Sequence, residues 1–223
     1  MARLNVTGEG FTEESFVRLV LAPFLGERGV YAVSRSVATS RRHGTIRRGG
    51  MTDYARARGD IVRWLKQDHP AHVTTMFDFY ALPNDFPGFS SIPNSSLHDK
   101  VRHIETAVAA DIGNTRFIPY LQLHEFEGLL FSDVEVIDSE LASEIGDSRL
   151  LHLNEITATS ETPEHINDGY HTCPSRRLAV LFPRYQKATD GIRIAERIGI
   201  ESLRRKCVHF NEWVTRLVAL AQR

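Results

Sequence analysis

The sequence predicts an α/β protein, with a mostly parallel four-stranded sheet flanked by helices and a helical C-terminal extension. Short segments rich in β-branched and aromatic residues alternate with longer amphipathic segments up to about residue 132, which is typical of strands joined by crossover helices. Beyond that point the pattern is helical. We therefore expect residues 1–132 to form the α/β core and residues 133–223 to complete the same domain.

The expected elements of the core follow one another in strand and helix pairs. Strands are expected at 3–7, 29–35, 72–80 and 116–123, and helices at 12–25, 52–68 and 97–111. The basic stretch that ends at Gly50 and the segment 84–94, rich in Pro, Gly, Phe and Ser, are expected to be loops. Pro119 lacks a backbone N–H, so the fourth strand is expected at an edge or to be irregular.

The C-terminal part is expected to be helical. Val134 to Ile145 forms one predicted helix, whereas the polar segment 148–172 fits a long loop, a lid or a short helical insertion. Residues 175–220 predict three or four helices, with breaks near Pro183, Gly191 and Gly199.

Composition narrows the class of protein. The 223 residues carry a net charge of −1, which argues against a general polyanion binder. No apolar run approaches a membrane span and the start lacks a signal-peptide pattern, so a cytoplasmic protein is expected. Cys173 and Cys207 lie outside any CxxC or zinc-finger spacing.

The charge is unevenly distributed. Residues 35–48 contain several arginines and no acidic residue. Arg41, Arg42, Arg47 and Arg48 form a basic patch that could steer a phosphate backbone. A solvated loop is the simpler interpretation of such a patch by itself, but an acidic metal site nearby would favour the phosphate interpretation.

Two acidic residues follow the first expected strand. Glu9 lies in the turn after it, directly before Gly10, and Glu13 comes one helical turn later. Ligands of open α/β sheets bind beyond the carboxyl ends of the strands, and two carboxylates there suggest a divalent cation. Alternatively, the acids stabilise the helix dipole, Thr12 is the N-cap and the glycine serves the turn.

Further acidic residues end two later strands. Asp78 ends the third strand and would meet Glu9 if strands one and three are neighbours; a cap or turn role is the alternative. Glu125 and Glu127 lie ~200° apart on a helix, where only one could serve the site, but on the same side of a strand. His124 could be a ligand or acid–base group, although a lone histidine is more often structural.

A late basic element completes the candidate site. Arg176 and Arg177 lie in Pro-Ser-Arg-Arg, and Lys187 ends Tyr-Gln-Lys in the helical tail. A lysine near a metal site can stabilise charge on a transferring phosphate, whereas the simpler interpretation is a solvent-facing lysine.

Taken together, these segments resemble the Toprim fold, and in particular the Toprim nuclease domain of the OLD (overcoming lysogenization defect) family. The resemblance is closest to small standalone Toprim-like proteins encoded beside ATPase genes in bacterial defence loci. The matching segments are 9–13, 77–80, 124–131, 174–178 and 185–187.

The resemblance implies a nuclease that cleaves DNA or RNA with two Mg²⁺ or Mn²⁺ ions. The implied metal ligands are Glu9, Glu13, Asp78, Glu127 and, less favoured, Glu125. Among these, Glu9 and Asp78 would act in catalysis together with Lys187, which would lie near the scissile phosphate. Arg177 would bind nucleic acid together with Arg41, Arg42, Arg47 and Arg48.

The resemblance also implies an ATPase partner of the ABC or AAA type, and a homodimer is left open. The chain has no Walker A loop, so any ATP use would come from another chain. Tyr80 stands where many Toprim enzymes have a second Asp, which weakens one metal site unless Asp85 replaces it. A non-catalytic module that docks on an ATPase and senses a ligand is therefore the second hypothesis, and a phosphohydrolase or primase-like enzyme is the third.

Overall fold

The computed structural model describes residues 1–42, 45–48, 51–166, 169 and 172–222, with the backbone alone for 38–42, 45–48 and 81. The strands are β1 (Ala2–Gly8), β2 (Val30–Ser36), β3 (Ala38–Arg42), β4 (Thr45–Arg48), β5 (His72–Asp78), β6 (Phe117–Ile118) and β7 (Leu121–Gln122). The longer helices are α3 (Tyr54–Gln67), α4 (Leu97–Ile112), α6 (Val134–Ile145), α7 (Leu150–Ala158), α8 (Pro174–Leu181), α9 (Asp190–Ile198) and α11 (Val208–Val218).

Shorter helical elements complete the chain. They are α1 (Phe11–Phe16), α2 (Ala22–Gly26), α5 (Phe126–Leu130) and α10 (Ile200–Lys206), with a π-helical turn at Val17–Leu21 between the first two. Short 3₁₀ turns lie at Phe79–Ala81, Phe89–Ser91, Pro163–His165 and Ala219–Gln222. None of the described helices is long and apolar enough to cross a membrane.

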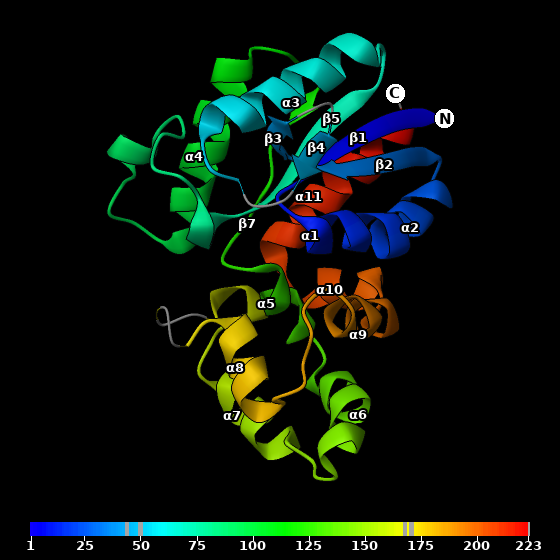
Figure 1. The fold of residues 1–223 in the computed structure, drawn as a ribbon, viewed down its shortest axis with the longest axis vertical. Helices are drawn as coiled ribbons and strands as arrows, with labels where there is room; N and C mark the ends of the chain where they lie inside the picture. The colour runs from blue at the N-terminus through cyan, green and yellow to red at the C-terminus, as the bar shows by residue number, and fades with distance from the viewer. Residues whose placement is uncertain (43–44, 49–50, 167–168, 170–171, 223) are drawn as a thin grey trace.

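The main sheet confirms the predicted α/β class. In the described part of the chain it has five strands in the order β2-β1-β5-β6, with β7 also paired to β5, and its pairs are parallel (Figure 1). Gly8 of β1 pairs with Met76 of β5, so the carboxyl ends of these two strands meet at one edge. The fourth expected strand is split into β6 and β7 around Pro119, at the edge of the sheet, as its missing N–H predicted.

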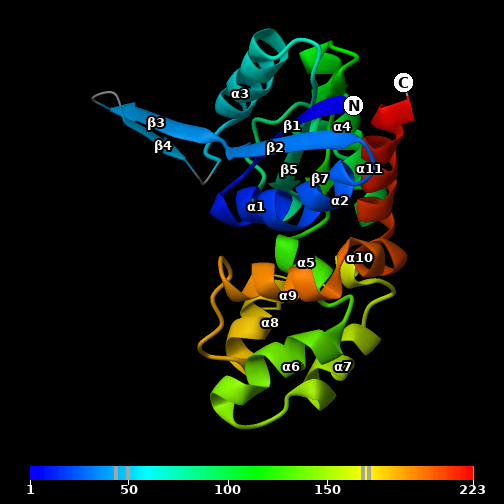
Figure 2. The same ribbon diagram turned by 90° about the vertical axis from the view of Figure 1, so that its right-hand side faces the viewer.

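Helices cover both faces of the sheet. Figure 2 shows α3 on one side of the strands and α1 and α2 on the other. Along β5, Val73 and Phe77 enter the core with α3 and α4, while Met76 enters the opposite core with α1 and α11. This alternation follows from the two-residue period of a strand.

The larger core joins the sheet to the helical C-terminal region. It runs from Leu4 in β1 through Phe16 in α1 to Leu153 in α7 and Trp213 in α11. The polar segment 148–172 contains α7 and the 3₁₀ turn at 163–165, and four helices, α8 to α11, follow it.

The basic segment is not the loop that its composition predicted. Its backbone forms β3 and β4, an antiparallel ribbon that extends away from the main sheet (Figure 2). The β-branched residues Thr39, Thr45 and Ile46 favour extended backbone and were outweighed in the prediction by the many arginines.

The expected break near Gly191 lies directly before that residue, because α9 begins at Asp190. A Cβ on Gly191 would come within 2.9 Å of the Tyr185 hydroxyl, so close packing also favours glycine there. One smaller prediction was wrong. Thr12 is not the N-cap of the first helix, because Gly10 holds that position. Gly199 does end α9, with a φ of 75°.

Candidate active site

Glu9 links the ends of two neighbouring strands. It directly follows β1, and its backbone N–H donates to Met76 O of β5 at 3.1 Å. Its carboxylate Oε2 accepts a hydrogen bond from the Asp78 N–H at 3.2 Å. The parallel pairing of β1 with β5 therefore brings Glu9 and Asp78 to one edge of the sheet.

Glu13 is buried beside them in the first turn of α1. It is 4% exposed, and its Oε2 accepts a hydrogen bond from the Gly10 N–H at 2.8 Å. Gly8, the last residue of β1, allows this close approach, since a Cβ on Gly8 would lie 3.1 Å from Glu13 Cβ. One oxygen of Glu13 thus serves the helix start, as the structural alternative expected, while its charge still acts on its acidic neighbours.

Lys187 connects two further carboxylates. It lies in the segment between α8 and α9, and its Nζ is 2.9 Å from Glu127 Oε2 and 3.8 Å from Asp78 Oδ2. Glu127 is fully buried in the first turn of α5, and Asp78 is 7% exposed, while 38% of the lysine side chain is exposed. The lysine is therefore an ion-pair partner of the acidic cluster that remains accessible from outside.

Burial and mutual repulsion make these groups unusually basic. Burial and the charge of Glu13 raise the pKa of Glu9 from 4.5 to about 7. Burial, followed by the charge of Glu13, raises the pKa of Asp78, and burial raises that of Glu127. Burial opposes the charge of Lys187, but the surrounding carboxylates raise its pKa above the usual value. Without a further cation, the acidic cluster therefore cannot ionise fully at low cost.

The two glutamates near α5 have different partners. Glu125 is the N-cap residue of α5, and its carboxylate accepts hydrogen bonds from Ser175 N at 3.0 Å and Ser175 Oγ at 3.1 Å. Glu127, inside the helix, pairs with Lys187 instead. Glu125 thus ties α5 to the start of α8 and directs both of its oxygens there.

No second carboxylate takes the place of Tyr80 directly after β5. Tyr80 lies in the 3₁₀ turn after Asp78 and is 40% exposed. Asp85 accepts hydrogen bonds from Tyr54 N at 3.1 and 2.9 Å and so holds the start of α3.

The expected nucleic-acid-binding arginines lie mostly on the ribbon. Arg41 and Arg42 belong to β3 and Arg47 and Arg48 to β4, and their side chains lie outside the described part of the structure. Arg177, on α8, donates from Nε to the backbone carbonyl of Thr172.

Two polar residues at this edge escaped the sequence analysis. Gln122 ends β7 in register with Asp78 and is fully buried, and its Oε1 accepts from the Tyr120 hydroxyl at 2.6 Å. Gln122 Nε2 and the Tyr185 hydroxyl lack a hydrogen-bond partner among the described residues. The position of Gln122 at a strand end was the signal that could have revealed it.

The carboxylate oxygens are spread over the edge rather than gathered at one point. Within the described ranges, three ligand atoms lie within 4.8 Å of one another only in a separate group, His98, His209 and Glu212. An ion at the carboxylate edge would therefore be held by few side-chain oxygens at a time.

The fold and this edge define an α/β protein with a buried acidic cluster and an ion-paired lysine at the carboxyl ends of parallel strands. The chain belongs to the DUF4276 family, a domain of unknown function, whose family model matches residues 8–218. No curated protein and no solved structure matches the chain significantly.

Proposed function

We propose that this protein is a metal-dependent nuclease of Toprim type, which hydrolyses phosphodiester bonds in DNA or RNA with Mg²⁺ or Mn²⁺. The observation that carries the proposal is the meeting of acidic side chains and one lysine at the carboxyl edge of β1 and β5. These residues are Glu9, Glu13, Asp78, Glu127 and Lys187. Ligands of open α/β sheets bind beyond this edge.

The donor set fits a hard divalent cation. Asp78 Oδ1 and Glu127 Oε1 are buried and have no hydrogen-bond partner in the part of the chain that the structure describes. Carboxylate oxygens suit Mg²⁺, which keeps several waters and needs only one or two carboxylates besides phosphate oxygens.

Bound ions would supply a polarised phosphate and an activated water at neutral pH. The side chains of the protein would position the ions and balance their charge. Glu9, with a pKa of about 7, would lose its proton when a cation binds beside it. Lys187 presents a partly exposed ammonium group beside two carboxylates, where it can stabilise negative charge on a phosphate.

The arginine-bearing ribbon leaves the sheet close to this edge. Val37, between β2 and β3, donates its N–H to Gly8 O at 3.0 Å, directly before Glu9. A strand of nucleic acid held by Arg41, Arg42 and the arginines of β4 would thus reach the carboxylates. Such binding would weaken steeply with salt, since it depends on phosphate contacts. We further propose that an ATPase encoded nearby controls the activity.

A non-catalytic module that docks on such an ATPase is the second candidate function. The specific observation in its favour is Tyr80, which replaces a carboxylate while Asp85 is engaged at the start of α3. The retained carboxylates favour the nuclease, because buried acids that repel one another destabilise a protein without a cation.

Cleavage assays separate the two candidates. Plasmid, single-stranded DNA and total RNA would be incubated with Mg²⁺ or Mn²⁺, with chelator controls and with the partner ATPase added or omitted. The matched variants are Glu9→Gln and Glu155→Gln, the second of which changes an exposed glutamate on α7. Cleavage that needs metal and is lost only in Glu9→Gln supports the nuclease. No cleavage under any condition, with stable ATPase binding, supports the docking module.

A further inference from the structure

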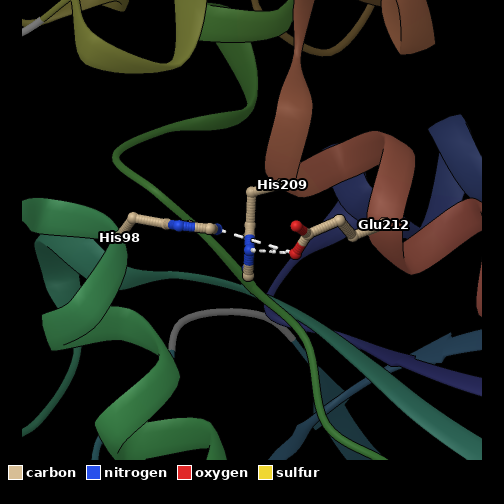
Figure 3. A group of neighbouring side chains, drawn as sticks. All are labelled: His98, His209 and Glu212. Carbon is tan, nitrogen blue, oxygen red and sulfur yellow. Dashed lines mark ion pairs between the residues drawn. The ribbon is translucent and has the colours of Figure 1, made fainter.

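A second group of potential metal ligands lies between α4 and α11, away from the elements that carry the carboxylate cluster. Figure 3 shows the imidazoles of His98 and His209 and the carboxylate of Glu212 turned toward one another. One ligand atom of each lies within 4.8 Å of the others. Glu212 Oε2 is 3.7 Å from His98 Nε2 and 4.0 Å from His209 Nδ1.

The orientation of His209 is set by its neighbours. It is 4% exposed, and its Nε2 lies 3.0 Å from Glu105 Oε1, which also accepts a hydrogen bond from Leu121 N at 2.8 Å. Because this carboxylate oxygen only accepts hydrogen bonds, the neutral His209 ring carries its hydrogen on Nε2 and its lone pair on Nδ1. A carboxylate behind a histidine in this way orients metal-ligating imidazoles in proteins.

The two histidine nitrogens that face the group are unsatisfied. His209 Nδ1 and His98 Nε2 are buried and have no hydrogen-bond partner among the described residues. The lone pair of His209 Nδ1 and the Glu212 Oε2 atom, 4.0 Å apart, repel each other, and a cation between them would remove the repulsion.

We propose that His98, His209 and Glu212 form a binding site for a transition-metal ion of the Zn²⁺ class, with a fourth position open to water. Imidazole and carboxylate ligands suit this class of ion. Bonds of ~2.1 Å in a tetrahedral site separate ligand atoms by ~3.4 Å. The present ligand atoms, which lie within 4.8 Å of one another, would therefore move closer together around the ion. His209 also lines a cleft of about 730 Å³ and a smaller cavity of about 150 Å³, which leave room for a water ligand.

Arg102 balances the charge of Glu212 in the absence of an ion. Its Nη2 lies 2.8 Å from Glu212 Oε1 and 2.7 Å from Oε2. Because the arginine is on the exposed side, it can remain on Oε1 while Oε2 turns to the ion. The ion would then tie the start of α4 to α11, which are far apart in sequence.

The test measures metal binding by the chelator-treated full chain, with Zn²⁺ by calorimetry and Co²⁺ by visible absorption. The variants His98→Ala and Glu212→Gln are expected to weaken Zn²⁺ binding at least ~100-fold and to abolish the tetrahedral Co²⁺ bands. Glu105→Gln is expected to weaken it ~10–100-fold, because it perturbs only the orientation of His209. His98→Ala should fold, since the removed nitrogen has no hydrogen-bond partner among the described residues.

Two controls make the assignment specific. His152→Ala removes an exposed imidazole on α7 and should retain wild-type Zn²⁺ affinity, whereas Glu9→Gln reports any Zn²⁺ that binds at the carboxylate cluster instead. The proposal is overturned if the wild type binds no Zn²⁺, if His98→Ala binds it as tightly as the wild type, or if only Glu9→Gln loses it. None of these results depends on nuclease activity.

Discussion

Replacing Glu9 with Gln should stabilise the metal-free protein at alkaline pH, although it alters the candidate active site. Glu9 releases its proton near pH 4.5 in the unfolded chain and near pH 7 in the folded one. Between these values the folded state binds more protons, so the free energy of unfolding decreases as the pH rises. Glutamine keeps the shape and the acceptor for the Asp78 N–H but carries no charge.

The size of this effect follows from the shift. Each pH unit between the two pKa values costs about 1.4 kcal/mol, so the rise from about pH 5.5 to 7 costs about 2 kcal/mol. The wild type should lose this amount relative to Glu9→Gln, and the loss should be complete above about pH 8. The two proteins should approach equal stability at the acidic end.

Urea unfolding in the presence of chelator at both ends of this pH range measures the difference. Glu155→Gln, on the exposed face of α7, should follow the wild type at each pH. Added Mn²⁺ should stabilise the wild type more than Glu9→Gln, because a ligand stabilises the state that binds it. Equal pH dependence in the wild type and Glu9→Gln would refute the buried, repelling carboxylate cluster.

Three further changes, and one control substitution, test the ion pair, a buried helix start and the packing of a helix, each by urea unfolding. Lys187→Met should lower the free energy of unfolding by about 2 kcal/mol at pH 8 and by less at pH 5.5, because it leaves two buried carboxylates without their ion-pair partner. The value is kept low because the ammonium group is partly exposed. An equal loss at both pH values would contradict this reasoning. Glu164→Ala should lower the free energy of unfolding by about 2–4 kcal/mol, because Glu164 accepts hydrogen bonds from two backbone N–H groups at the start of α11 at 2.9 and 3.0 Å. An unchanged stability would show that water can take the place of the carboxylate. Gly191→Ala should destabilise the protein by about 1–3 kcal/mol, because the added Cβ would meet the Tyr185 hydroxyl. As a control, Gly59→Ala in α3, with open space around it, should stabilise the protein by about 1 kcal/mol. Stability changes of the same sign would be inconsistent with this packing.

The sequence was informative where local rules apply. The alternation of strand and helix patterns predicted the parallel sheet, and the missing N–H of Pro119 predicted the irregular edge strand. Glu9 and Asp78 were expected to meet if the first and third expected strands are neighbours; β1 does pair with β5, and a hydrogen bond joins the two residues. Local rules were weaker for the ribbon of β3 and β4, where a high arginine content concealed residues that favour strands.

The sequence by itself determined the fold class and the strand ends that carry two of the acidic residues, because strand and helix periods are local properties of the chain. Only the tertiary structure decided which distant side chains share a site. Lys187 reaches Glu127 because the connection between α8 and α9 packs against α5, and His209 meets Glu105 across 104 residues because α11 packs beside α4. Such contacts depend on how side chains pack between the helices and the sheet, and the spacing of residues along the chain does not predict that packing.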